Sequence, residues 1–328
     1  MCGEPARTLV LGWHRPELRR KLALAVESLS FSPRPPPLTG SLWQRVQYGL
    51  WQPLLGARLL LAQRTLLNAA LVPVGLLAGF CALWAFGGFL LDLPSGSRPL
   101  APVAGRACKT FYQTFAVLAP LPTVIMAGHY TRLVVRARQF LDLPPALPPR
   151  ESIWRALGRA VAQAILIALA IAPATLALGL VPWLGHTLVR VAAAAWALHW
   201  IVVDAFDGTR VQPIGAVPRV LAQPQGSPWF VRGLRTLGRV PLLGWPLRRF
   251  AGLCDRLARP WRTEIAVIEE HPALVVGFAL ATAALLATPV LNLFFRPIVL
   301  IGAVHVLGWF ESGGVVAGAV GGDEGPVS

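Results

Sequence analysis

Charged residues are scarce in this chain. Only 14% of its 328 residues are Asp, Glu, Lys or Arg, against roughly 25% in an average soluble protein. Residues 65–91, 110–131 and 160–189 contain no charged residue at all, and about 20 apolar residues suffice to span a bilayer as a helix. This shortage of charge excludes a soluble enzyme and a disordered chain, and it predicts an all-α, polytopic integral membrane protein.

Sequence signatures of catalysis and of metal binding are also lacking. The four cysteines form no C-x-x-C pair and have no companion histidines at zinc spacing, so they indicate neither a metal site nor a disulfide framework. No P-loop, dinucleotide fingerprint, G-x-S-x-G or H-E-x-x-H pattern is present. Glu269, Glu270 and His271 lie together, but acidic residues fit the first turn of a helix better than a metal site. We therefore predict no enzyme activity, no cofactor and no bound metal.

Acidic residues are half as frequent as basic ones. The chain has 30 Lys and Arg, of which 28 are Arg, against 15 Asp and Glu, which gives a net charge of +15. The basic residues flank apolar segments instead of forming a stripe on a soluble domain, which favours anionic lipid headgroups over nucleic acid as the partner. Nine lie before residue 65, six within 132–159 and ten within 204–264, against three within 92–109. Because basic segments stay on the cytoplasmic side, both termini are predicted to be cytoplasmic.

The chain divides into three regions by composition. Residues 1–40 form a basic, Pro-rich tail, and residues 41–311 form the membrane domain. Residues 312–328 are rich in glycine and mildly acidic, and they are predicted to be disordered.

The membrane domain is expected to open with an interfacial helix that Ser41 caps and that presents an apolar face with two tryptophans. Two long transmembrane helices are predicted next, within 65–91 and 110–131. A basic loop, 132–159, follows the second. The basic segment 204–264 is expected to hold another interfacial helix, with an apolar stripe and an opposing basic face: Leu247, Phe250, Leu253 and Leu257 against Arg248, Arg249, Arg256 and Arg259.

Two apolar blocks are predicted to be helical hairpins. Residues 160–203 are interrupted at 181–186, and residues 272–310 are interrupted at 288–292. Proline ends or kinks a helix, and Gly or Asn accepts the left-handed conformation of a tight turn. The tips therefore contain Pro182 and Gly185 in the first block, and Pro289 and Asn292 in the second. Several arms have only about 17 or 18 residues, so they are either short full spans or re-entrant helices.

An arginine follows each hairpin tip. Arg190 and Arg296 lie in otherwise apolar sequence, where an arginine costs about 2.5–3.5 kcal/mol by insertion scales. One interpretation is an anion pathway, in which both guanidinium groups and the nearby helix N-termini attract an oxyanion. The other is that both arginines reach the far headgroups. His186 is a further candidate for anion binding, although it and His199 are also explained by helix packing.

The two hairpins resemble the CysZ-type sulfate permeases, which are grouped with the etoposide-induced protein 2.4 membrane proteins. The resemblance rests on VPWLGHTLVRVAAAAWALHWIVVDAFD at residues 181–207 and on TPVLNLFFRPIVLIGAVHVLGW at residues 288–309. YGLWQPLLGARLLLAQRTLLNAALVP at residues 48–73 is similar to the family's entry into its first helix. The similarity covers roughly residues 41–311.

The resemblance implies two long spanning helices and two helical hairpins, some of which penetrate only part of the membrane. It also implies a homo-oligomer and inward sulfate transport across a bacterial inner membrane, although eukaryotic members are endoplasmic-reticulum proteins linked to autophagy. The sulfate permeases place Gly and two adjacent Arg just before the first long helix. Here Arg58 and Arg64 lie six residues apart.

Two hypotheses of function follow. The first is an anion permease, with sulfate as the expected substrate, in which Arg58, Arg64, Arg190, Arg296 and His186 bind the anion. The second is a scaffold without transport that holds anionic lipid or a partner through its basic amphipathic segments.

Overall fold

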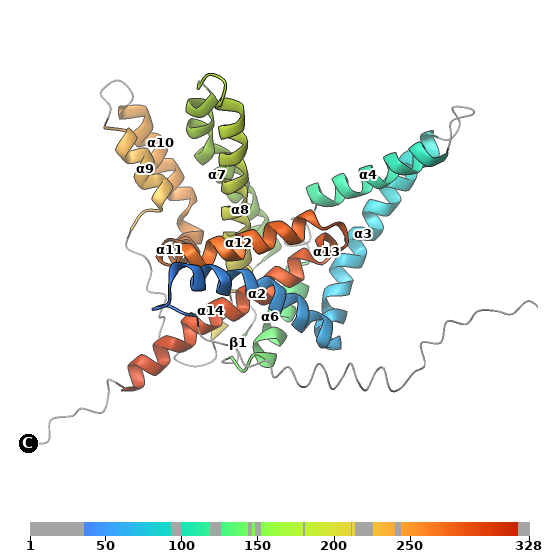
Figure 1. Ribbon diagram of the computed structural model, residues 1–328, viewed down its shortest axis with the longest axis horizontal. Coiled ribbons are helices and arrows are strands. Elements are labelled where there is room, and N and C mark those ends of the chain that lie inside the picture. Colours follow the sequence, from blue (N-terminus) through green and yellow to red (C-terminus); the bar gives the residue numbers. More distant parts are fainter. Residues whose placement is uncertain are drawn as a thin grey trace, which may run out of the picture. The chain divides into compact units, whose positions relative to one another are not determined.

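The computed structural model describes residues 36–92, 100–118, 126–143, 146–147, 152–179, 181–210, 212–213, 226–239 and 244–320. These residues are almost entirely helical (Figure 1). The exceptions among them are two strands of two residues each, β1 (Ala146–Leu147) and β2 (Gln212–Pro213), which pair antiparallel. The prediction of a helical protein with membrane-spanning helices is confirmed at this level. Most of the predicted N-terminal tail, residues 1–35, lies outside the described residues.

The first described helix, α2 (Leu42–Ala62), begins where the sequence predicts. The Ser41 hydroxyl accepts a hydrogen bond from the Gln44 backbone N–H at 3.3 Å, and Gln44 Oε1 accepts one from the Ser41 N–H at 2.8 Å. This capping box satisfies two backbone N–H groups that the helix itself leaves free. Trp43 and Trp51 are exposed, as expected for the lipid-facing side of an interfacial helix.

The other face of α2 packs on α12 (Pro272–Ala287) and α14 (Phe295–Val320). Glycines make this possible at two crossings. A Cβ on Gly277 of α12 would lie 2.9 Å from the Leu50 backbone N, and a Cβ on Gly302 of α14 would lie 2.8 Å from the Gln52 carbonyl oxygen. Gly49 and Gly56 make the corresponding contacts from α2. Small residues let helix backbones approach closely, which is how helices associate in membranes.

The helix α3 (Arg64–Asp92) is the first candidate span. It is long and apolar enough to cross a membrane between Arg64 and Leu91, in agreement with the long apolar helix predicted within 65–91. Much of its apolar surface is exposed in the chain, including Leu71, Leu76, Phe80, Leu83, Trp84 and Leu91. An exposed apolar surface of this kind needs lipid or a partner protein around it.

The predicted second span differs from the structure. The helix α4 (Leu100–Leu118) begins before residue 110 and carries Arg106 and Lys109, and among the described helices it does not qualify as a span. A separate helix, α6 (Ala127–Phe140), then runs into the predicted basic loop and buries its Leu133 side chain. The charges on α4 lie before the charge-free run that suggested the span, and most of the buried face of α6 lies after it. The middle of that run, residues 119–125, lies outside the described residues.

The first predicted hairpin is formed by α7 (Ile153–Gly179) and α8 (Gly185–Asp207), with Pro182 in the tip (Figure 1). Both helices qualify as spans, with 26 and 23 residues, or roughly 39 and 34 Å at 1.5 Å per residue. They exceed the expected 17 or 18 residues because α7 starts earlier, through Trp154 and Leu157, and α8 continues to Asp207. Their length favours full spans over re-entrant helices for this hairpin.

The basic segment after α8 contains α9 (Trp229–Leu237), α10 (Gly244–Leu257), the 3-10 helix η1 (Arg259–Trp261) and α11 (Arg262–Glu270). The predicted basic face is exposed. Of the predicted apolar stripe, Leu247, Phe250 and Leu257 are half-buried and Leu253 is exposed, whereas the small side chains Ala251 and Cys254 are fully buried. The predicted stripe is therefore only partly exposed.

The second predicted hairpin consists of α12, the short α13 (Pro289–Leu293) and α14. The 16 residues of α12 extend about 24 Å, less than the roughly 30 Å of a hydrocarbon core. The helical stretch Arg259–Glu270 and α12 are together long and apolar enough to span a membrane, but the chain bends by 105° between them. The helix α14 continues to Val320, so the disorder predicted for residues 312–328 is wrong for residues 312–320. Residues 321–328 lie outside the described residues.

Candidate functional site

Ion pairs gather where α8 ends. Asp204 and Asp207 lie one turn apart on α8. Three arginines pair with them: Arg159 from α7, Arg210 just after α8 and Arg296 from α14. Glu264 from α11 pairs with Arg210. We call these six residues the charge cluster. Its three positive and three negative groups balance, which lowers the cost of placing them away from water.

Arg296 is the most buried arginine of the charge cluster. It lies in the first turn of α14, and its Nη1 pairs with the Asp204 carboxylate while its Nη2 donates to the Asp204 carbonyl oxygen at 3.4 Å. Its Nε is buried and has no hydrogen-bond partner among the described residues. Gly208 makes room for this guanidinium, because a Cβ there would lie 3.2 Å from Nη2.

A phenol on another helix lies close enough to Arg296 to be affected by its charge. Burial raises the pKa of Tyr130 on α6 to about 12, and the nearby Arg296 guanidinium opposes that rise. The Tyr130 hydroxyl therefore stays protonated at neutral pH and can donate a hydrogen bond. Asn292 on α13, four residues before Arg296, also has a buried side-chain oxygen without a partner among the described residues.

The second half of the charge cluster is fully paired. Asp207 contacts both Arg159 and Arg210, the latter at 3.2 Å, and Arg210 also pairs with the buried Glu264. These contacts connect α7, α8 and α11. They differ from the Arg296–Asp204 pair, in which one arginine depends on one carboxylate.

A second polar group lies inside the α2–α14 contact. The buried Gln52 Oε1 and His305 Nδ1 are 2.5 Å apart, and Gln52 Nε2 donates to the Tyr48 carbonyl oxygen at 3.1 Å. The rings of Tyr48 and His305 stack with centroids 6.4 Å apart. Because Gln52 lies between Gly49 and Gly56 on α2, its buried contact with His305 fixes the register of α2 against α14.

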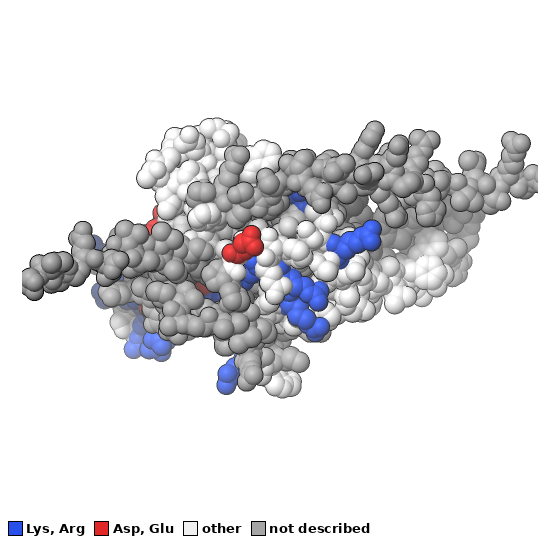
Figure 2. Space-filling model, turned by 90° about the horizontal axis from the view of Figure 1, so that it is seen from below, with Lys and Arg blue, Asp and Glu red and all other residues white. Residues whose placement is uncertain are grey.

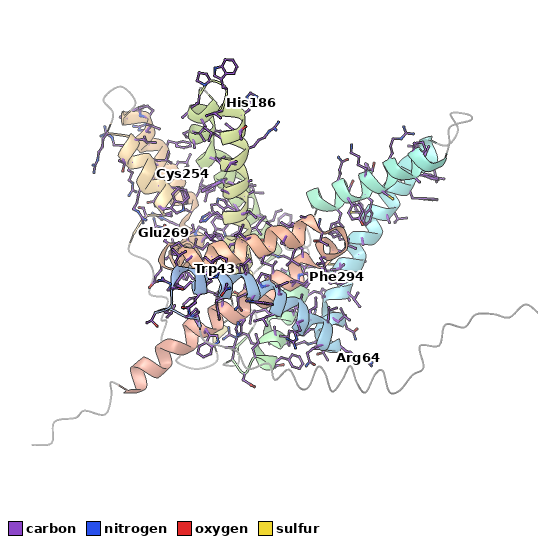
Figure 3. All side chains as sticks on the ribbon, in the orientation of Figure 1. Trp43, Arg64, His186, Cys254, Glu269 and Phe294 are labelled. Carbon is purple, nitrogen blue, oxygen red and sulfur yellow. The ribbon has the colours of Figure 1, made fainter. Side chains whose placement is uncertain are left out.

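The other predicted anion-binding residues lie on the surface of the chain. Arg58, Arg64, Arg190 and His186 are all exposed. Figure 3 shows His186 beside the tip of the α7–α8 hairpin and Arg64 where α2 joins α3. Arg190 precedes Asp204 by 14 positions on α8, or about 21 Å along the helix axis. The structure therefore does not bring Arg190 and Arg296 together, and the exposed position of Arg190 fits the headgroup interpretation.

The predicted tip residues shape the turns. Pro182 is exposed, and Trp183 beside it has a φ of 65°. Gly185 is buried, because a Cβ there would lie 2.8 Å from the Leu178 carbonyl oxygen. In the second tip, Pro289 occupies the first turn of α13 and Thr288 is its N-cap.

Comparison with known proteins gives no relative for this chain. No family model, no curated protein and no solved structure matches it. The resemblance to the CysZ-type permeases therefore remains a prediction.

The described residues contain no group of three or more His, Cys, Asp or Glu side chains that could hold a metal ion. Glu269 instead accepts hydrogen bonds from the Trp229 backbone N–H at 2.6 Å and from Arg232 at 2.7 Å. His271 stacks on Phe310 with ring centroids 4.5 Å apart. The Glu269 and His271 side chains are therefore not arranged as a pair of metal ligands.

Sequence reasoning identified Arg296 but missed its partner. Asp204, Asp207 and Arg210 follow one another at intervals of three, which favours contacts among themselves and does not point to Arg296. The local sequence around Glu264 and Arg159 does not predict their pairing, because their partners are 54 and 48 positions away.

On the face in Figure 2, the described Lys and Arg side chains lie in separate groups. The expected preference for anionic lipid over nucleic acid stays a prediction.

Proposed function

We propose that this protein is an integral membrane protein that conducts an inorganic anion, with sulfate as the first substrate to test. The single observation that supports the proposal most is Arg296: a buried arginine in the first turn of a helix that follows a break. An ionisable residue within the membrane region of a protein marks a functional site by default.

The helix break adds to the positive potential at this place. The first turn of α14 leaves backbone N–H groups without partners inside the helix, and the helix dipole is positive there. Transporters use such broken helices to bind anionic groups near the middle of the membrane. Arg296, the α14 N-terminus and the Tyr130 hydroxyl together supply donors that suit an oxyanion.

The exposed arginines have a secondary part in the proposal. Arg58, Arg64 and Arg190 lie near the ends of candidate spans, where they raise the local anion concentration without holding the anion. The localisation in a bacterial inner membrane, the cytoplasmic termini, the homo-oligomer and the relation to the CysZ-type permeases belong to the same proposal.

Uptake of radiolabelled sulfate into proteoliposomes tests the proposal. Wild-type protein is expected to transport sulfate, Arg296→Ala to lose at least about tenfold, and Arg296→Lys to retain part of the rate because it keeps the charge. Arg190→Ala is expected to lose less than Arg296→Ala. Arg249→Ala serves as control, because this exposed side chain stacks on Trp245 in α10. Absent uptake by the wild type would contradict transport. Equal uptake by the wild type, Arg296→Ala and Arg190→Ala would contradict the proposed part of these arginines.

A scaffold without transport is the second candidate. It is favoured by the exposed arginines of α10 and η1, namely Arg248, Arg249, Arg256 and Arg259. In that case the four arginines determine lipid binding, and Arg190 and Arg296 are dispensable for it.

A further inference from the structure

Arg296 needs a negative charge beside it. Its side chain is only 7% exposed, and the adjoining N-terminus of α14 adds positive potential. A buried cation without a counter-charge costs several kcal/mol. In this structure Asp204 provides that counter-charge.

Asp204 lies on the outer side of the pair. Its side chain is 31% exposed, against 7% for Arg296. The carboxylate is therefore the more accessible member of the pair. An anion that pairs with Nη1 takes the place of this carboxylate.

The donors around Arg296 exceed what Asp204 uses. A guanidinium has five N–H groups; Asp204 engages Nη1 and Nη2, whereas Nε is buried and lacks a partner among the described residues. A tetrahedral oxyanion offers four acceptor oxygens in different directions, so it has acceptors for Nε as well as for the Nη groups.

The neighbouring carboxylate shows the contrast. Asp207, one turn later on α8, is held by two arginines from two elements. Asp204 has one arginine partner and an exposed side. It can therefore turn toward water without breaking the contacts among α7, α8 and α11.

We infer that Asp204 is a resident counter-anion that a tetrahedral oxyanion displaces from Arg296, so that Asp204 sets the affinity and specificity of the site. This inference rests on the proposed function and deepens it. Asp204 is a specificity-determining residue that acts by competition: a weakly binding anion does not replace the tethered carboxylate, whereas a divalent oxyanion does.

The test measures thermal unfolding of purified protein in detergent micelles against sulfate concentration. Removing the competing charge in Asp204→Asn is expected to lower the sulfate concentration for half-maximal stabilisation by about tenfold relative to wild type. Asp255→Asn is the matched control, because this carboxylate on α10 also pairs with arginines, Arg235 of α9 and Arg262 of α11, but not with a member of the charge cluster. It is expected to respond to sulfate as wild type does.

The phosphate of a lipid headgroup offers the same acceptor oxygens as a free oxyanion. A parallel titration with short-chain phosphatidylglycerol separates the two sources. Tighter binding of phosphatidylglycerol but not of sulfate in Asp204→Asn assigns the site to a headgroup.

Loss of the charge also leaves Arg296 unpaired, so Asp204→Asn can be unstable without added anion. In that case sulfate is expected to restore a monodisperse protein, and chloride at equal ionic strength is not. A variant that neither oxyanion restores, or a folded variant with unchanged or weaker oxyanion binding, overturns the inference. Tighter binding in Asp204→Asn together with absent uptake by wild type instead supports the inference and contradicts transport.

Discussion

At the scale of single residues, the packing of α2 depends on the absence of side chains. Gly49 and Gly56 face α12 and α14, and Gly277 and Gly302 face α2 in return. At these positions the nearest atoms to an added Cβ belong to backbone, and backbone cannot turn aside as a long side chain can. Any substitution must therefore separate α2 from α12 or from α14, and the second of these contacts also contains the Gln52–His305 pair.

Substitution of Gly277 by Ala should destabilise the protein by about 1–3 kcal/mol, the usual cost of overpacking. The methyl group would lie 2.9 Å from the Leu50 backbone N, so α12 must shift away from α2. Thermal unfolding in micelles measures the change. Gly79→Ala on α3 is the matched control, because no heavy atom lies within 4 Å of a Cβ there. Equal unfolding midpoints for the two variants would refute the close crossing.

Residue-scale features differ in how far the sequence predicts them. The Ser41 cap depends on a residue three positions away and follows from the local pattern. The Arg296–Asp204 pair joins residues 92 positions apart, and nothing local in either sequence segment selects the other. The exposed position of Arg190 likewise depends on how long α8 is, which a short apolar run does not determine.

At the scale of elements, charge-free runs predict helices better than they predict their ends. The run at 65–91 corresponds closely to α3, because charges lie at both ends of the helix. The run at 110–131 does not correspond to one helix, since α4 extends past two charges and α6 begins within the run. Helices continue through a charge when the side chain can reach the membrane boundary, so a lone arginine or lysine does not mark an end.

The length of α7 and α8 predicts that their tip lies across the membrane from α10. Trp183 in the tip is fully exposed, so Trp183→Cys in a variant without native cysteines should react with an impermeant maleimide in intact cells. Arg256→Cys on α10 should react only after the cells are permeabilised, because basic segments stay inside. Labelling of both positions from the same side would show that the hairpin is re-entrant.

At the scale of the whole molecule, the excess of positive charge has two different uses. Some arginines are compensated within the fold, as Arg232 is by Glu269 and Arg235 by Asp255. Others, on α10 and η1, are exposed beside apolar side chains such as Trp245 and Leu253. That combination is typical of a surface that lies on an anionic membrane.

Anionic lipid should therefore stabilise the protein through α10 and η1. Each arginine near an anionic surface contributes about 1 kcal/mol, so replacing Arg248, Arg249, Arg256 and Arg259 by Gln should remove most of the rise in unfolding temperature that phosphatidylglycerol gives in nanodiscs. The rise in wild type should also shrink as salt increases. The control variant, Arg232→Gln with Arg235→Gln, loses charges that Glu269 and Asp255 already balance, and it should keep most of the lipid-dependent rise. If both variants lose the lipid-dependent rise equally, net charge and not the surface of α10 determines lipid binding. If the variant with four Gln substitutions loses sulfate uptake as well as this rise, the lipid contact and the proposed anion path are not separate functions of this chain.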